Sequence, residues 1–118
     1  MTRKEIAIEV ATKIWKWERD ARGPDGISVY YGPVDGPLLF EDKLEDEAFS
    51  WQGFGRTVEA MEKKGWSLTV NNSGWGFYNA GKFYEILGDR EVFCTPMNWF
   101  DGVHNIALEI INENTYEE

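Results

Sequence analysis

The sequence predicts an α+β fold in which three helices pack with an antiparallel meander sheet of three to five strands, in an α/β/α-type layered sandwich. Apolar residues recur at helical spacing in three separate segments. Before the third of these, from residue 66 onward, apolar and polar residues alternate as in strands with one buried face. The 118 residues contain no long linker, so we expect a single domain, 1–118, with residues 113–118 frayed.

The first predicted helix covers residues 3 to about 19. Thr2 and Glu5 form a capping box, which is typical of a helix start. The next apolar residues lie within about 80° of one another at the helical period: Ile6, Val10, Ile14 and Trp17. Ile8 and Trp15 lie on nearly the opposite side and need a second cover. The following segment or a second copy of the chain would supply it.

The next part of the chain is extended and then acidic. Residues 27–31 are predicted to form a short strand, and residues 38–40 a strand or an extended apolar segment. Two prolines within residues 32–37 remove backbone donors and indicate an irregular connector. The run EDKLEDE comes next, at 41–47, and its carboxylates are Glu41, Asp42, Glu45, Asp46 and Glu47.

A second helix is predicted at about 51–64, with Ser50 as its N-cap and Gly65 as its left-handed C-cap. Its apolar residues form a narrow stripe: Trp51, Phe54, Val58 and Met61. Gly53 and Gly55 each weaken such a helix by roughly 1 kcal/mol relative to alanine. Close passage of another backbone would explain their presence.

Strands and a third helix complete the chain. Asn71 to Gly74 favours a tight hairpin turn after the strand that begins near Trp66. We expect 75–79 and 83–87 to continue outward as strand, and 91–95 to return after a turn at 88–89. Residues 96–100 are predicted to be a connector, and Asp101 to cap a helix at about 102–112.

Motifs for catalysis, metals or cofactors are weak. Cys94 and His104 are the single cysteine and histidine, and Cys94 lies in an apolar run that favours a buried thiol over a catalytic dyad. The run at 41–47 lacks the spacing and glycine of a calcium loop. Gly74 and Gly76 begin a dinucleotide pattern, but Asn79 replaces its third glycine. We expect no catalytic residue, no metal and no cofactor.

The net charge of −9 limits the partners. An acidic surface repels nucleic acids and anionic membranes, so direct nucleic-acid binding is not expected. It suits a protein with a basic face. We find neither a signal peptide nor an apolar run long enough to span a membrane, and we therefore expect a cytoplasmic location.

Three segments resemble the phage alpha-beta-alpha sandwich domain family, small proteins of phages and prophages of Gram-positive bacteria. They are the opening segment 2–17, the segment 49–66 with VEAMEKKGW, and the closing helix with Ile106-Ala107-Leu108 after Thr95-Pro96. Residues 20–48 and the insertion 97–100 depart from the family pattern. The resemblance implies the layered fold and a phage origin in a bacterial host cytoplasm. It supplies no catalytic residue.

Two functional hypotheses remain. In the first, the protein is a non-enzymatic inhibitor of a host defence protein, which it binds through the five acids of 41–47 and two exposed aromatics, Trp15 and Trp99. In the alternative, it sequesters a small nucleotide immune signal by stacking and ion pairing. The residues predicted for that role are Trp75, Tyr78, Asn79, Lys82 and Arg90.

Overall fold

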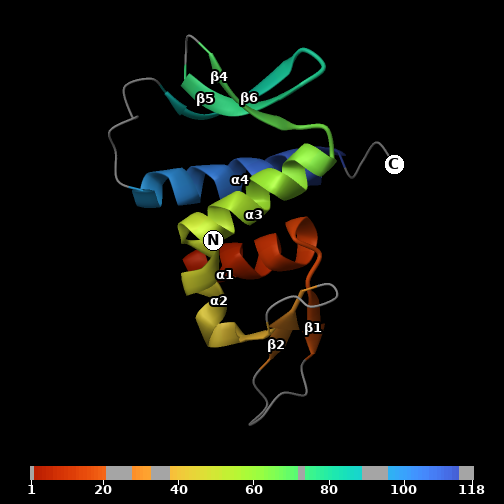
Figure 1. The fold of residues 1–118 in the computed structure, drawn as a ribbon, viewed down its shortest axis with the longest axis vertical. Helices are drawn as coiled ribbons and strands as arrows, with labels where there is room; N and C mark the ends of the chain where they lie inside the picture. Colours follow the sequence, from red (N-terminus) through yellow and green to blue (C-terminus); the bar gives the residue numbers. More distant parts are fainter. Residues whose placement is uncertain (1, 21–27, 33–37, 72–73, 89–95, 115–118) are drawn as a thin grey trace.

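Helices occupy the middle of the molecule, and a small antiparallel sheet lies at each end of its long axis (Figure 1). The computed structural model describes residues 2–20, 28–32, 38–71, 74–88 and 96–114. The first sheet contains β1 (Glu18–Asp20), β2 (Val29–Tyr31) and β3 (Leu38–Phe40), and the second contains β4 (Ser67–Asn71), β5 (Gly74–Asn79) and β6 (Lys82–Gly88). The helical elements are α1 (Arg3–Glu9), η1 (Val10–Ile14), α2 (Glu41–Ala48), α3 (Trp51–Lys63) and α4 (Pro96–Asn114).

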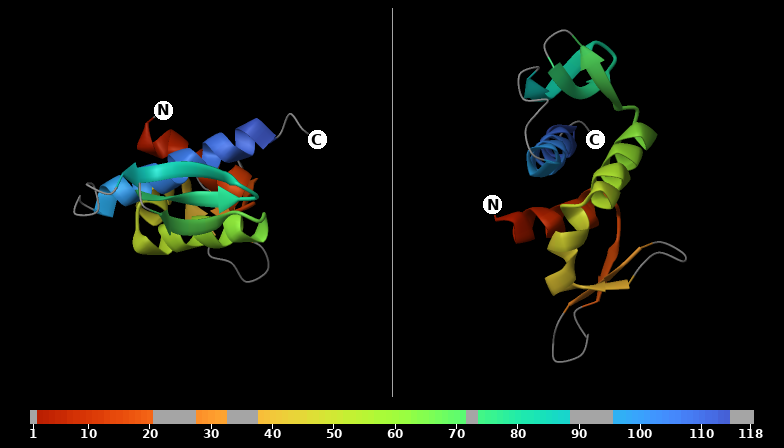
Figure 2. Two further views of the ribbon diagram at one scale, coloured as in Figure 1. Left: turned by 90° about the horizontal axis from the view of Figure 1, so that it is seen from above. Right: turned by 60° about the vertical axis from the view of Figure 1, so that its left-hand side comes forward.

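The α+β class is confirmed, with the strands divided between two sheets. The second sheet lies over α4 and α3, as the view from above shows (Figure 2). Its inner face is apolar, and Phe77 is fully buried against the helices. The predicted strands at 27–31 and 38–40 form β2 and β3 of the other sheet, within the described residues.

The second sheet has a hairpin that the sequence pattern did not predict. Asn79 pairs with Lys82, and the two residues between them both have positive φ: 51° at Ala80 and 89° at Gly81. Positive φ at both positions is the geometry of a type I′ turn. The prediction that 75–79 and 83–87 run outward together is therefore wrong, because the chain reverses between them.

The first predicted hairpin is consistent with the register of the sheet. Asn71 pairs with Gly74, whose φ is 145°. Residues 72–73 of the predicted turn lie outside the described residues. The strand predicted at 91–95 lies outside them too.

The N-terminal helix is shorter than predicted because it changes its hydrogen-bonding pattern. Thr2 caps it and accepts from the Glu5 amide at 3.2 Å. After Glu9 the chain continues as the π-helix η1, in which the Trp15 amide donates to the Val10 carbonyl at 2.9 Å. A π turn holds one more residue than an α turn, which rotates the residues after it by about 100°. The rotation places Trp15 in the core, with 8% of its surface exposed.

Two predictions about this segment are wrong. The helix ends at Ile14, and Lys16 adopts φ 63° before β1 starts at Glu18. Trp15 offers little surface to a second copy of the chain, because only 8% of it is exposed and its indole donates to Thr57 within the core. Ile8 is half-buried against the same core. The suggested oligomer contact through these two residues therefore loses its basis.

Helix α3 matches its predicted limits, whereas α4 begins earlier than predicted. Ser50 accepts from the Gly53 amide at 3.1 Å, and Gly65 has the left-handed φ of 92° expected at its C-cap. Residues 96–100 are the first residues of α4 and not a connector, which fits the preference of proline for the first turn of a helix. Asp101 lies inside α4 and pairs with Arg3 at 3.1 Å, so it is not an N-cap.

Candidate functional site: an acidic helix and an exposed tryptophan

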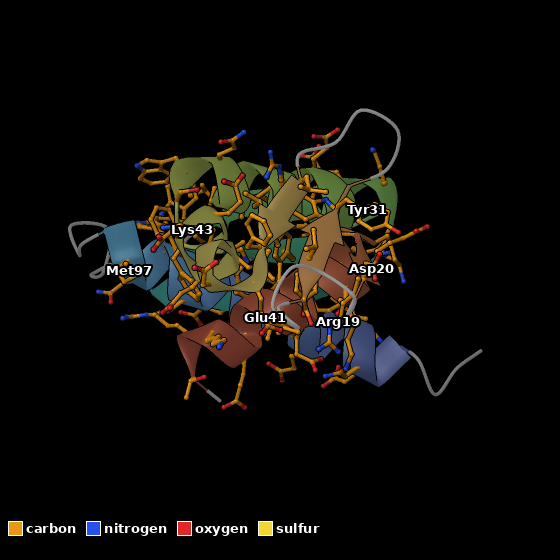
Figure 3. All side chains as sticks on the ribbon, turned by 90° about the horizontal axis from the view of Figure 1, so that it is seen from below. Arg19, Asp20, Tyr31, Glu41, Lys43 and Met97 are labelled. Atoms are coloured by element: carbon orange, nitrogen blue, oxygen red, sulfur yellow. The ribbon has the colours of Figure 1, made fainter. Side chains whose placement is uncertain are left out.

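The acidic run forms the helix α2. Because an α-helix has 3.6 residues per turn, some of its carboxylates face the protein and others face solvent. Leu44 and Ala48 point inward and are almost fully buried. Two acids bind within the protein. Glu41 accepts from the Tyr30 hydroxyl at 3.1 Å and lies 3.9 Å from Arg19 Nη2. Figure 3, which views the molecule from below relative to Figure 1, labels Glu41 and Arg19.

Glu47, at the other end of α2, forms an ion pair with Arg56 of α3. The two side chains are 20% and 24% exposed, so this pair is largely shielded from solvent. At the first end, burial and then the hydrogen bond to Glu41 raise the pKa of Tyr30. Glu41 and Glu47 thus bind α2 to neighbouring parts of the protein. Two of the five acids that were predicted to bind a partner therefore already have partners inside the protein.

Two of the remaining three acids of α2 face outward. Asp42 and Asp46 are exposed and one helical turn apart, with Lys43 beside them. Neither aspartate has an ion-pair partner among the described residues. Glu45 is half-buried, and its charge contributes to the raised pKa of Arg3, after the larger effects of Asp101. The solvent face of α2 therefore carries two negative charges that form no ion pair with another described residue.

Two exposed aromatic residues flank α2 in the chain: Phe40 is its N-cap and is 41% exposed, and Trp51 follows it. Trp51 occupies the first position of α3, directly after the corner with α2, and 59% of its surface is exposed. Two edge-to-face contacts fix the indole: Phe100 with ring centroids 4.9 Å apart, and Phe54 at 5.5 Å. The predicted buried stripe of α3 is wrong at Trp51, since Gly53, Thr57 and Met61 are its buried residues. Trp51 directly follows the N-cap Ser50, and this position at the very start of the helix is the sequence signal that favours its exposure.

The two aromatics predicted for partner binding are placed differently. Trp15 is buried, which contradicts its expected exposure. Trp99 is half-buried, and its ring packs edge to face against two others. The ring centroids are 6.2 Å apart for Phe54 and 5.0 Å apart for Trp75. Trp99 therefore supports the aromatic cluster that holds Trp51, but it presents only part of its surface.

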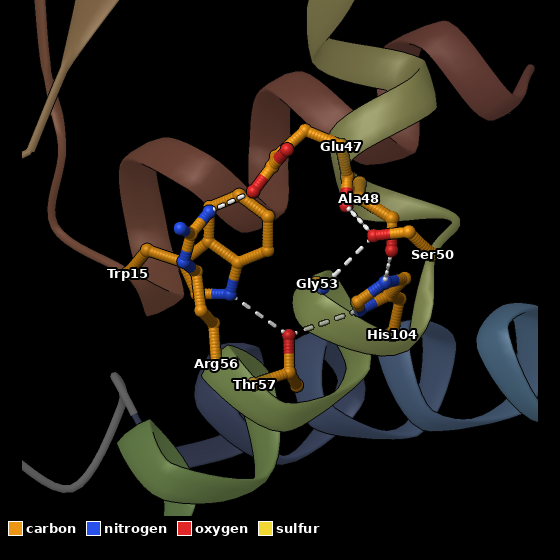
Figure 4. Close-up of polar contacts among 8 residues, drawn as sticks. All are labelled: Trp15, Glu47, Ala48, Ser50, Gly53, Arg56, Thr57 and His104. Carbon is orange, nitrogen blue, oxygen red and sulfur yellow. Dashed lines mark hydrogen bonds and ion pairs between the residues drawn. The ribbon is translucent and has the colours of Figure 1, made fainter. Parts of the chain in front are cut away.

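The corner between α2 and α3 depends on a buried hydrogen-bond chain (Figure 4). Trp15 Nε1 donates to Thr57 Oγ1 at 2.9 Å, and Thr57 Oγ1 lies 3.0 Å from His104 Nδ1. His104 Nε2 lies 2.7 Å from the Ala48 carbonyl oxygen, which can only accept, so Nε2 carries the hydrogen. In the neutral ring Nδ1 then accepts from the Thr57 hydroxyl. Burial lowers the pKa of His104, which favours that neutral form.

His104 thus links α4 to the C-terminus of α2, and both of its nitrogens have partners. Cys94, the other half of the dyad considered from the sequence, lies outside the described residues. Among the residues that the structure describes, no three histidine, cysteine or acidic side chains form a group that could hold a metal ion.

The described residues among those predicted for nucleotide binding are divided between the two faces of the second sheet. Trp75 faces α4, where it contacts Trp99. Tyr78 is 46% exposed on the opposite face of the sheet, where its cross-strand partner is Phe83. Phe83 therefore lies on the same face as Tyr78 and not on the face of Trp75. Asn79 and Lys82 flank the turn of the β5–β6 hairpin, where Asn79 lies close to Gly65 after α3, and Arg90 is outside the described residues.

No protein-family model, characterised protein or solved structure that was compared with this chain shows a significant match. The resemblance to the phage alpha-beta-alpha sandwich domain family therefore stays a prediction. Among the described helices, none combines the length and apolar character needed to cross a bilayer.

Proposed function

We propose that the protein is a non-enzymatic phage or prophage accessory protein that binds and inhibits a bacterial defence protein in the host cytoplasm. The contact surface is the acidic–aromatic surface, defined as Asp42, Asp46 and Trp51. The phage assignment rests on the sequence resemblance.

The observation that carries this proposal is the exposure of a tryptophan whose ring packs against two other aromatic rings. Trp51 keeps 59% of its surface in solvent while Phe54 and Phe100 hold its ring. Tryptophan is enriched among the residues that dominate binding energy at interfaces. A ring that already packs against its neighbours loses little further conformational freedom on binding, which favours affinity.

Charge supports the same surface. Asp42 and Asp46 have no cationic partner among the described residues, so their charges are available to a partner. The chain as a whole carries a net charge of −9. These features suit a defence protein with a basic face, for which acidic side chains increase the rate of association.

The proposal is tested by phage infection of a defended Gram-positive host that expresses the protein. The wild type is expected to raise the efficiency of plating, and Trp51→Ala is expected to abolish this effect. Asp42→Asn with Asp46→Asn is expected to weaken it. Glu85→Gln with Glu109→Gln is the matched control, because it removes two charges from exposed positions on β6 and α4. A folded Trp51→Ala variant that raises the efficiency of plating as much as the wild type does would refute the proposal.

A further inference from the structure

A second feature lies where the end of the N-terminal helix meets α3. A pocket of about 370 Å³ opens between the end of the N-terminal helix and the C-terminal half of α3. Its volume falls within the range of about 300–1,000 Å³ that is usual for small-molecule sites. The residues around it are Ile14, Trp15, Lys16, Trp17, Arg56, Glu59, Ala60, Lys63 and Lys64.

An unusual backbone shapes one wall of this pocket. The π-helix η1 ends at Ile14, and Lys16 adopts φ 63°, a conformation that favours glycine. The Trp17 amide then donates to the Ala11 carbonyl at 2.8 Å, which closes a wide turn around Lys16. π-helices and left-handed non-glycine residues are both concentrated at functional sites. Here they meet at one lysine on the rim of a pocket.

The charge of the pocket is opposite to that of the whole chain. Four cations lie around it against one acid, Glu59, and the Glu47 carboxylate binds one of those cations, Arg56. Lys63 Nζ lies 3.6 Å from Glu59 Oε1, which makes these two side chains an ion pair. Lys16 and Lys64 have no carboxylate partner among the described residues, which leaves two positive charges at the pocket of a protein with net charge −9.

Apolar groups and the guanidinium of Arg56 form the rest of the pocket. The Arg56 guanidinium lies over the Trp17 ring, 5.1 Å from its centroid, and over the Trp15 ring at 5.7 Å. Ile14 and Ala60 add aliphatic surface. An anion with an apolar or aromatic body fits this combination better than a simple inorganic ion, because its body can stack beside the guanidinium and the indoles.

We propose that this pocket binds a small organic phosphate of nucleoside monophosphate size. Lys16 and Lys64 contact the phosphoryl group, and the apolar part of the ligand lies against Ile14, Ala60 and the Arg56–Trp17 stack. This site is separate from the acidic–aromatic surface and does not depend on it.

Calorimetry and tryptophan fluorescence with three probes test the proposal: AMP, pyrophosphate and adenosine. AMP is expected to bind most tightly, pyrophosphate more weakly and adenosine not measurably. Lys16→Gly removes the charge while it relaxes the left-handed backbone, so the variant is expected to fold normally. It should bind AMP about tenfold more weakly, as expected for a lost charge-assisted contact. Lys64→Gln should have a similar effect.

Lys4→Gln is the control, since Lys4 is an exposed lysine in the first turn of α1, at the opposite end of the N-terminal helix from the pocket. It should leave AMP binding unchanged. Equal binding of pyrophosphate and AMP would overturn the role of the apolar groups. Equal binding of adenosine and AMP, no binding of either anion at millimolar concentration, or unchanged AMP affinity in Lys16→Gly would overturn the site itself.

Discussion

Alanine at Gly53 and alanine at Gly55 should have opposite effects on stability, although both positions lie in α3 only two residues apart. A Cβ at Gly53 would lie 2.3 Å from the Glu47 carbonyl oxygen and 2.4 Å from the Ala48 carbonyl oxygen. A Cβ at Gly55 would meet no atom within 4 Å. The difference arises because the end of α2 crosses the first turn of α3 at Gly53.

These distances set the magnitude of the effect. The closest approach at Gly53 is about 0.7 Å short of the 3.0 Å below which real Cβ contacts essentially never occur. The obstructing atoms belong to the backbone, so the α2–α3 corner must shift, at a typical cost for overpacking of about 1–3 kcal/mol. The gain in helix propensity offsets about 1 kcal/mol of this cost. We expect Gly53→Ala to destabilise the protein by about 1 kcal/mol, and by at most about 2 kcal/mol, and Gly55→Ala to stabilise it by about 0.5–1 kcal/mol.

Urea denaturation followed by circular dichroism measures both changes, with equal m-values as the check that the unfolding transition is comparable. The expected order of the midpoints is Gly55→Ala, wild type, Gly53→Ala. A Gly53→Ala protein as stable as the wild type would refute the close approach of α2 and α3. Loss of stability in Gly55→Ala would refute its open surroundings.

Three further predictions concern the buried network and the second sheet. Because burial lowers the pKa of His104 below its ordinary value of 6.5, the unfolded chain takes up this proton first as the pH falls. The free energy of unfolding should therefore decrease below about pH 6.5, and less steeply in His104→Gln. Trp15→Phe removes the donor to Thr57 and should cost about 1 kcal/mol or more in urea denaturation. Ala80→Gly should raise stability by up to about 1 kcal/mol, because glycine adopts the positive φ of this turn without strain.

Each of these predictions has a clear contrary result. If stability depended on pH in the same way in His104→Gln and in the wild type, the pKa of His104 would not be lowered in the native protein, contrary to the inference. Trp15→Phe as stable as the wild type would contradict a buried bond to Thr57. Thermal denaturation that shows Ala80→Gly to be less stable would contradict the left-handed conformation at Ala80.

Local signals in the sequence predict α3 well and the N-terminal helix poorly. Ser50 and Gly65 mark the ends of α3 through capping geometry that depends only on neighbouring residues. The periodicity that predicts the N-terminal helix assumes a constant α-helical step. The π turn before Trp15 breaks that assumption. It accompanies a hydrogen bond from the Trp15 indole to Thr57, which is 42 residues away, so no local pattern reveals the contact.

The candidate site is predictable only in part for the same reason. Composition alone reveals the acidic run at 41–47, but only its helical geometry shows that Glu41 and Glu47 bind internally while Asp42 and Asp46 face solvent. Helical spacing assigns Trp51 to a buried stripe, since spacing alone does not show where the covering layer ends.

Site-specific photo-crosslinking tests the proposed partner surface most directly. A photoreactive amino acid would replace Trp51 in one variant and Val70 in another, because these side chains are similarly exposed, at 59% and 56%, in different parts of the fold. After irradiation of defended cells that express each variant, we expect a discrete adduct with one host protein from position 51 and none from position 70. No adduct from position 51, or the same adduct from both positions, would contradict the assignment of the acidic–aromatic surface as the partner-binding site.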